Sequence, residues 1–320
     1  MFASAFRRTI GTGAAAVLVA TTLAVIAAPT ASATPVCPGA GQSPVLAASV
    51  PGAVLEGVTV DPAGRLYTSD ALSGRIFRID APGARAVQVA SVPAGNSAGA
   101  LAWQPDGSLV VGYSGPSVLA GDLMRPGTLA RVDLANGSVT PFASGLSAAN
   151  GVAVAKDGTI YATNDFGNLV GRVAPNGSVQ PDWSSIPSAN GAALTSDGAY
   201  LYVAQTFASP GISRIPVANP GAPETVVAFG GGDVIKAADG LTLDSRNRPI
   251  VPTDVSGEIL RVDGPGQVCS LASGLFVSSV VTYGRGEQGF GNGRLFRAGF
   301  DGNIYEIPGG FDAAARTAAP

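Results

Sequence analysis

The sequence predicts an all-β fold, a six-bladed β-propeller with four-stranded blades in which an N-terminal strand closes the last blade. Composition is the first observation behind this prediction: 44 of the 320 residues are Gly and 24 are Pro, and both residues interrupt helices. Short runs of Val, Ile, Leu and Tyr recur between them, as in strands. The second observation is a segment that repeats every 40 to 52 residues or so, roughly the length of one propeller blade.

Each copy of the repeat is centred on a short polar or small residue at the start of an apolar run. The six copies are centred on Glu56, Ala98, Asn150, Asn190, Asp239 and Ser279. In the first copy we expect four strands, at residues 57–60, 65–68, 75–79 and 87–90. Asp-Gly pairs at 157–158 and 197–198 mark tight hairpins, because Gly accepts positive φ at little cost. A single meander of this kind cannot bury both faces, so the copies must pack side by side and the ring must close.

The ends of the repeat predict how the ring closes. Residues 45–49 have the pattern of an outer strand with no inner strands before them, and the last copy ends after residue 307 without one. We therefore expect the propeller to span residues 44–310, after an N-terminal segment at 34–43 and before a disordered tail at 311–320. This closure would bring Cys37 near Cys269, and one disulfide between them suits an exported protein. Two free buried thiols are the alternative.

Residues 1–33 have the pattern of a secretory signal peptide. Arg7 and Arg8 precede an Ala-rich apolar run that ends in Ala31-Ser32-Ala33, a small-x-small cleavage pattern. We therefore expect a secreted, extracellular protein with no membrane contact after cleavage. A twin-arginine signal and a retained membrane anchor are the alternatives.

Charge and composition exclude several classes of function. The chain has 19 Lys and Arg against 22 Asp and Glu, a net charge of −3, and loss of two arginines with the signal takes this to about −5. An acidic balance argues against a nucleic-acid partner. The complete lack of His excludes His-based triads and His-ligated zinc. We expect a monomer whose partner is a small-molecule substrate.

Polar residues converge on one mouth of the expected central channel. The first strand of each blade lines this channel, so the residue just before it lies at the mouth. Four of the six positions offer carboxylate or amide oxygens, which suit calcium, magnesium or manganese; they are Glu56, Asn150, Asn190 and Asp239. The alternative is that each side chain only caps a turn.

The ends of the second strands supply an outer rim to the same mouth. We expect substrate contacts here and from Asn150; the rim residues are Asp70, Asn164, Asp165, Gln205 and Asp254. Stabilisation of turns is the alternative role for each. Two insertions, at residues 112–127 and 230–238, belong to loops on this face, and long loops gathered on one face of a repeat scaffold usually carry binding or gating.

Several phrases resemble the regucalcin, gluconolactonase and senescence marker protein family of lactone hydrolases. They are Leu55-Glu56-Gly57-Val58, residues 149–154 followed by 157–161, Asn190-Gly191 with 197–203, and residues 239–244. The resemblance covers nearly all of the chain after residue 33. It implies a divalent metal, most often Ca²⁺, held by Glu56, Asn190 and Asp239, with Asn150 contacting metal or substrate. It also implies that Asp239 is the general base.

The resemblance therefore implies a secreted, metal-dependent hydrolase of lactones or related esters. Two departures bear on the substrate. Val58 stands where the family has proline after the Glu-Gly pair, and Ala148 stands where its sugar-acid enzymes have arginine. The alternative is a non-catalytic, NHL-like extracellular binding propeller whose polar ring is vestigial or holds a structural ion.

Overall fold

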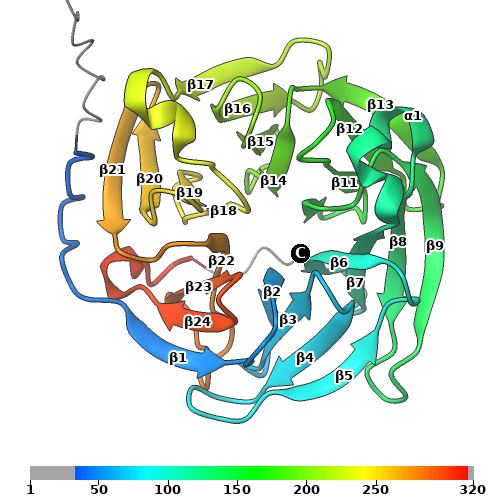
Figure 1. Cartoon of the computed structure of the whole chain (residues 1–320), viewed down its shortest axis with the longest axis horizontal. Helices are drawn as coiled ribbons and strands as arrows, with labels where there is room; N and C mark the ends of the chain where they lie inside the picture. The colour runs from blue at the N-terminus through cyan, green and yellow to red at the C-terminus, as the bar shows by residue number, and fades with distance from the viewer. Residues whose placement is uncertain (1–32, 316–320) are drawn as a thin grey trace, which may run out of the picture. The chain divides into compact units, whose positions relative to one another are not determined.

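The computed structural model describes residues 33–315, which form a ring of six four-stranded antiparallel sheets around a central axis (Figure 1). The predicted six-bladed propeller is thereby confirmed. Of the expected signal peptide at residues 1–33, only Ala33 belongs to the described residues. Within the described residues, no helix has the length and apolar character needed to cross a membrane.

The first three blades follow one another along the chain, each running from the axis outward. The first blade contains β2 (Leu55–Val60), β3 (Leu66–Asp70), β4 (Arg75–Ile79) and β5 (Val87–Ser91). The second contains β6 (Ser97–Trp103), β7 (Leu109–Ser114), β8 (Gly127–Val132) and β9 (Val139–Leu146). The third contains β10 (Val152–Val154), β11 (Ile160–Ala162), β12 (Leu169–Val173) and β13 (Val179–Ser185).

The last three blades repeat this order, and the sixth takes its outer strand from the N-terminal part of the chain. The fourth contains β14 (Ala189–Leu194), β15 (Tyr200–Gln205), β16 (Gly211–Pro216) and β17 (Glu224–Ala228). The fifth contains β18 (Thr242–Leu243), β19 (Pro249–Pro252), β20 (Ile259–Gly264) and β21 (Gln267–Ala272). The sixth contains β22 (Ser278–Tyr283), β23 (Leu295–Gly299), β24 (Asn303–Glu306) and β1 (Val45–Ser49).

The sixth blade joins the two ends of the propeller. Strand β1 pairs antiparallel with β24, from Val45 opposite Glu306 to Ser49 opposite Asn303. The Ser49 hydroxyl also donates to the Asn303 Oδ1 at 2.7 Å. Ring closure is therefore made by backbone pairing between segments that lie far apart in sequence.

The core is divided among the interfaces between blades. Each of six apolar clusters draws its buried side chains from two neighbouring blades. For example, Tyr67 of the first blade packs edge-on against Trp103 of the second, with ring centroids 5.4 Å apart. Since an isolated blade would expose both of its apolar faces, the blades are stable only together.

The predicted disulfide between Cys37 and Cys269 is present. The segment before β1 lies along β21, because the Cys37 amide donates to the Ser270 carbonyl at 2.9 Å and the Ser270 amide donates to Pro35 at 2.8 Å. The disulfide therefore fastens the N-terminal segment to the fifth blade, beside the sixth blade that β1 completes.

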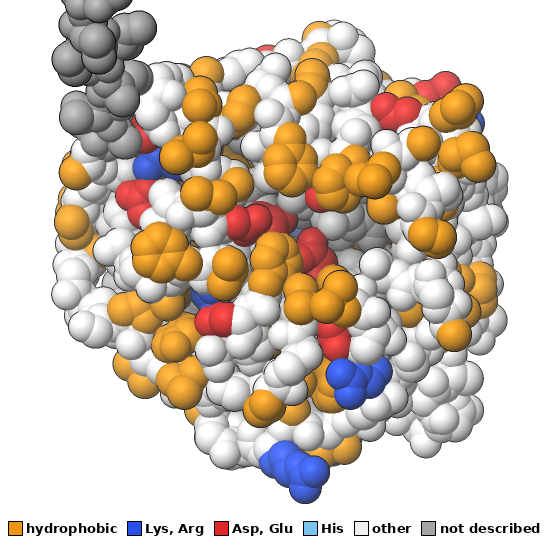
Figure 2. All heavy atoms as spheres, viewed as in Figure 1, with side chains coloured by type: hydrophobic (Ala, Val, Ile, Leu, Met, Phe, Trp, Pro, Cys, Tyr) orange, Lys and Arg blue, Asp and Glu red, His pale blue; other side chains and the backbone are white. Residues whose placement is uncertain are grey.

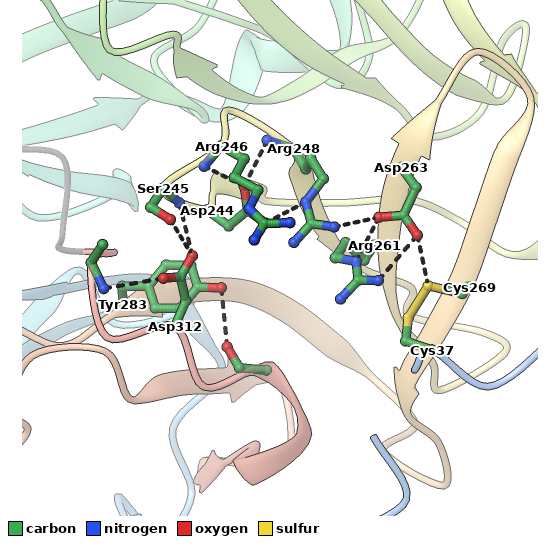
Figure 3. Close-up of polar contacts among 12 residues, drawn as sticks. Cys37, Asp244, Ser245, Arg246, Arg248, Arg261, Asp263, Cys269, Tyr283 and Asp312 are labelled. Atoms are coloured by element: carbon green, nitrogen blue, oxygen red, sulfur yellow. Dashed lines mark hydrogen bonds and ion pairs between the residues drawn. A yellow bond between two sulfur atoms is a disulfide. The ribbon is translucent and has the colours of Figure 1, made fainter. Parts of the chain in front are cut away.

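The ordered chain extends past residue 310, where the sequence predicts a disordered tail. Figure 3 shows Asp312 against the fifth blade, where its carboxylate accepts hydrogen bonds from the Ser245 amide at 3.1 Å and hydroxyl at 2.6 Å. Ala315 is buried in the cluster between the fifth and sixth blades. These contacts hold residues 311–315 on the ring, and residues 316–320 lie outside the described part of the chain.

The two insertions carry short helical turns over one face of the ring, which faces the viewer in Figure 1. Between β7 and β8 lie η1 (Pro116–Ala120) and α1 (Gly121–Met124). Between β17 and β18 lies η2 (Gly231–Ile235), while η3 (Pro308–Gly310) follows β24. Asp122 of α1 anchors the first insertion to the third blade by accepting from the Asn168 amide at 2.7 Å and the Leu169 amide at 3.1 Å.

Reduction of the Cys37–Cys269 disulfide is expected to destabilise the protein. The two residues are 232 positions apart, and the chain-entropy model gives such a bridge about 5 kcal/mol. For a domain of this size the melting temperature should fall by roughly 5–10 °C in reductant, as measured by calorimetry. The double variant Cys37→Ser/Cys269→Ser is the control and should show the lower value with or without reductant. Equal melting of oxidised and reduced wild type would contradict the prediction.

Candidate functional site

The start of every inner strand and the end of every second strand meet at the same mouth of the ring. In the first blade, Leu55 at the start of β2 pairs with Asp70 at the end of β3. The antiparallel order then places the β3–β4 loop and the connection between blades at this mouth as well. Figure 2 shows this face, with acidic side chains in its central hollow.

Glycines let the inner strands approach closely at the mouth. In five blades a glycine follows the residue on which the repeat is centred; these are Gly57, Gly99, Gly151, Gly191 and Gly240. A Cβ on Gly151 would lie 2.4 Å from the Asn190 carbonyl oxygen, and one on Gly191 would lie 2.5 Å from the Gly240 Cα. Side chains at these positions would push neighbouring blades apart, so the glycines determine how closely the polar residues beside them gather.

Hydroxyl groups at the ends of second strands tie three blades to the blade that follows. The Ser69 hydroxyl donates to the Gly99 carbonyl at 2.6 Å, and the Thr163 hydroxyl donates to the Asn190 carbonyl. In the fourth blade the Thr206 hydroxyl donates to the Ala238 carbonyl at 2.6 Å. The last two bonds fix the backbone at Asn190 and next to Asp239.

Glu56 is held at the mouth by side chains from two other blades. Its Oε1 accepts from the Asn150 amide nitrogen at 3.0 Å, and its Oε2 accepts from the Ser279 hydroxyl at 2.8 Å. Burial raises the pKa of Glu56, although both hydrogen bonds favour the ionised form and oppose this rise. The first, third and sixth blades therefore converge on one carboxylate.

Asn190 has a buried side-chain amide oxygen without a hydrogen-bond partner among the described residues. Its side-chain nitrogen donates to the Thr206 hydroxyl at 2.9 Å, which fixes the orientation of the amide. The Asn190 Oδ1 is buried and accepts no hydrogen bond from the described residues. A buried oxygen without a donor is costly, so this atom is available to a ligand.

Asp239 interacts electrostatically with three other carboxyl groups of the site. It is buried, and burial raises its pKa well above the ordinary value, with further increases from the charges of Glu56, Asp254 and Asp165. Asp239 and Asp254 hydrogen-bond to each other through their side chains. Burial and the Glu56 charge likewise raise the pKa of Asp254 to about 8 and that of Asp165 to about 7.

The two outer carboxyls of this group each keep one unpaired oxygen. The Oδ1 atoms of Asp165 and Asp254 are buried and have no hydrogen-bond partner among the described residues. The charges of Glu56, Asp165 and Asp254 all act on Asp239, and Arg297 partly offsets the negative charge at Asp254.

Three of the predicted rim residues are instead engaged in local structure. Asp70 accepts from the Val54 and Leu72 amides, both at 3.1 Å, and pairs with Arg75 at 3.2 Å. Asn164 donates to the Ser147 hydroxyl at 2.9 Å and caps the turn that follows β11.

Gln205 behaves in the same way. It donates to the Pro187 carbonyl at 3.1 Å and accepts from the Ser213 hydroxyl at 2.6 Å. Hydrogen bonds to nearby loops and strands thus engage all three side chains, whereas Asp165 and Asp254 act on Asp239 through their charges. Thr206 and Ser279 complete the site; the sequence places Ser279 in the ring without a role and does not single out Thr206.

The donors at the mouth are oxygens, which suit a hard divalent cation. Among residues 33–315, no group of three or more His, Cys, Asp or Glu side chains is placed closely enough to form a metal cluster by itself. Oxygen ligands for a cation here would therefore include amides, namely the unpartnered Asn190 Oδ1 together with the Glu56 and Asp239 carboxylates, and Asn150 hydrogen-bonds to Glu56.

The sequence profile described as the SMP-30/Gluconolactonase/LRE-like region matches residues 54–274. The chain belongs to this family. The resemblance of the repeat phrases to this family is thereby confirmed. Among curated protein sequences, none matches the chain significantly.

Solved structures share the fold. The calcium-binding protein regucalcin from Agrobacterium tumefaciens aligns with a TM-score of 0.68 and 17% identity, over 87% of this chain and 96% of its own. A gluconolactonase from Xanthomonas campestris aligns with a TM-score of 0.66 and 18% identity, over 88% and 98% of the two chains.

A third solved structure shares the fold at a lower TM-score. A catalytically inactive histidine-to-alanine variant of virginiamycin B lyase from Staphylococcus aureus aligns with a TM-score of 0.53 and 16% identity, over 85% of this chain and 91% of its own. The chain described here contains no His.

In the absence of divalent metal, stability is expected to fall as pH rises from 5 to 8. Glu56, Asp165, Asp239 and Asp254 all have folded-state pKa values above their ordinary ones. Groups of this kind contribute stability while protonated in the folded state and lose it as pH passes through the raised pKa. Melting temperatures in a chelating buffer should therefore decline across this window.

The double variant Asp165→Asn/Asp254→Asn should flatten this decline, because amides do not ionise. Its control is Asp106→Asn, an exposed position on a turn at the opposite face, which should keep the wild-type slope. A melting temperature that rises from pH 5 to 8 in the metal-free protein would contradict the prediction.

Proposed function

We propose that this chain is an exported, metal-dependent hydrolase of lactones or related esters, with Ca²⁺ as the metal and Asp239 as the general base. The observation that carries the proposal is the gathering of buried carboxyls and the unpartnered Asn190 oxygen at one mouth of the ring. Membership of a family that includes gluconolactonases supports the reaction class. The disulfide supports export, since disulfides persist in oxidising compartments.

Glu56, Asn190 and Asp239 would hold the metal. A divalent cation bound there would act as a Lewis acid on the substrate carbonyl and stabilise the oxyanion that develops. Regucalcin, whose structure shares this fold, is a calcium-binding protein. The hydrogen bonds from Asn150 and Ser279 keep the Glu56 carboxylate in place, and the Thr206 hydroxyl keeps the Asn190 oxygen directed inward.

Asp239 would take the proton from the attacking water. Burial and the neighbouring carboxylates raise its pKa, and a carboxylate with a raised pKa is a stronger base near neutral pH. Binding of a cation lowers this basicity, so a single carboxyl that serves as ligand and base supports a modest rate. When the acyl C–O bond breaks, the protonated Asp239 would return this proton to the leaving alkoxide oxygen, and Asp254 would accept a hydrogen bond from Asp239.

The substitution Asp239→Asn should abolish lactone hydrolysis and weaken Ca²⁺ binding together. Loss of the base alone costs about 10²- to 10⁴-fold in rate. In wild type, Ca²⁺ at about 100 times its Kd should add about 2.7 kcal/mol to the free energy of unfolding, and the variant should lose most of this. Activity is measured on a lactone panel by pH-stat, and binding by the shift in melting temperature.

Asp106→Asn again serves as the matched control and should keep both properties. A wild-type protein that gains stability from Ca²⁺ but hydrolyses no lactone would contradict the enzyme proposal and favour the non-catalytic, NHL-like binding propeller. A wild type with no response to Ca²⁺, Mg²⁺ or Mn²⁺ would contradict the metal site itself.

A further inference from the structure

Large apolar side chains are exposed all around the mouth. Seven different loops on this face carry at least one, including Leu72, Leu123, Phe166, Phe207, Ile235, Val255 and Phe276. Figure 2 shows apolar side chains distributed around the acidic centre of this face. Exposed apolar side chains that surround a polar hollow mark a binding surface.

Phe166 and Phe207 form the best-defined part of this rim. Their rings stack with centroids 5.5 Å apart and planes inclined by 16°, yet the two residues remain 48% and 60% exposed. A stacked aromatic pair that stays open to solvent offers a rigid apolar platform at low entropic cost.

The platform is fixed directly to the site. Phe166 follows Asp165, and Phe207 follows Thr206, which orients Asn190. The Ser188 hydroxyl joins the two loops, because it donates to the Asp165 carbonyl at 2.7 Å and accepts from the Phe207 amide at 2.8 Å. The rings therefore lie one residue away from groups that face the centre.

The fifth blade repeats the same pairing of a polar residue with an exposed apolar one. Val255 follows Asp254 and is 54% exposed, and the Val277 amide fixes this loop by donating to the Asp254 carbonyl at 2.7 Å. Three successive blades thus direct a polar group inward and an apolar side chain outward at the end of the second strand.

Three cations near the mouth are paired with carboxylates, whereas Arg125 at the end of α1 is exposed. Arg75 pairs with Asp70 at 3.2 Å, and Lys236 pairs with Glu258. Arg297 is buried and pairs with Asp301 at 2.7 Å. The surroundings of the mouth therefore favour an uncharged, apolar ligand over a sugar acid or a phosphate ester.

We propose that the substrate is a lactone or ester with an extended apolar acyl chain or ring, which lies on Phe166, Phe207 and Val255 while its carbonyl faces Asp239. This inference rests on the proposed function, and it adds the substrate class. Each methylene group that the platform removes from water should raise kcat/KM about two- to fourfold, until the chain extends past the rim.

A series of γ-lactones from four to twelve carbons tests the proposal. In wild type, kcat/KM should rise with chain length. In Phe166→Ser/Phe207→Ser the rise should flatten, so that the loss of kcat/KM relative to wild type grows with chain length. Phe311→Ser, an exposed phenylalanine in the C-terminal segment away from the mouth, is the matched control and should keep the wild-type slope.

The other outcomes separate the two proposals. If wild type hydrolyses all lactones at one rate, or if the double substitution leaves the slope unchanged, the proposed apolar substrate class is wrong. The proposed lactonase activity is then unaffected. If no lactone is hydrolysed, calorimetric binding of unreactive alkyl-substituted cyclic ketones still measures the preference, and equal affinity across that series overturns it. The protein could also bind phosphatidylcholine vesicles. If the double substitution abolishes this binding but leaves the slope of kcat/KM against chain length unchanged, the rim binds a lipid surface and the proposal is wrong.

Discussion

The close approach of the inner strands at the mouth is the constraint on which the rest of the structure depends. Glycine follows the residue on which the repeat is centred in five blades, and a Cβ there would meet the backbone or side chain of the next blade at 2.4 to 2.9 Å. The gathering of Glu56, Asn190 and Asp239 is thus a consequence of backbone packing. It needs no direct attraction among these side chains, of which the two carboxylates repel each other.

That repulsion also explains the character of the site. Burial and mutual charge shift four carboxyl groups in the same direction, and a scaffold built from six interlocking apolar interfaces tolerates this cost. Structures often carry such local instability where a ligand relieves it. The stacked rings of Phe166 and Phe207 are a second local cost of this kind. A loop anchored to the polar centre keeps each apolar ring exposed to water.

Much of this arrangement could be predicted from the sequence, since it follows from periodicity. The repeat length gives the blades, and the residue on which each copy is centred gives the mouth. The expected strand at 75–79 agrees with β4. Periodicity could not distinguish the role of Asp70 from that of Asp254, because both lie at the end of a second strand. Only their hydrogen-bond partners differ. Arg75 and two backbone amides bind the Asp70 carboxylate, whereas Asp254 hydrogen-bonds to Asp239. The stacking of Phe166 on Phe207 depends on loop conformation, for which the repeat carries no signal.

The pairing of β1 with β24 has a consequence for how the protein reaches its native state. The Ser49–Asn303 contact spans 254 positions, so the last sheet cannot assemble until almost the entire polypeptide has emerged from the ribosome. Until then β1 lacks the strand with which it pairs, and an unpaired edge of this kind can recruit a strand from another molecule. Such long-range pairing is slow, which makes the interval before closure the time at which a nascent chain most needs protection from aggregation.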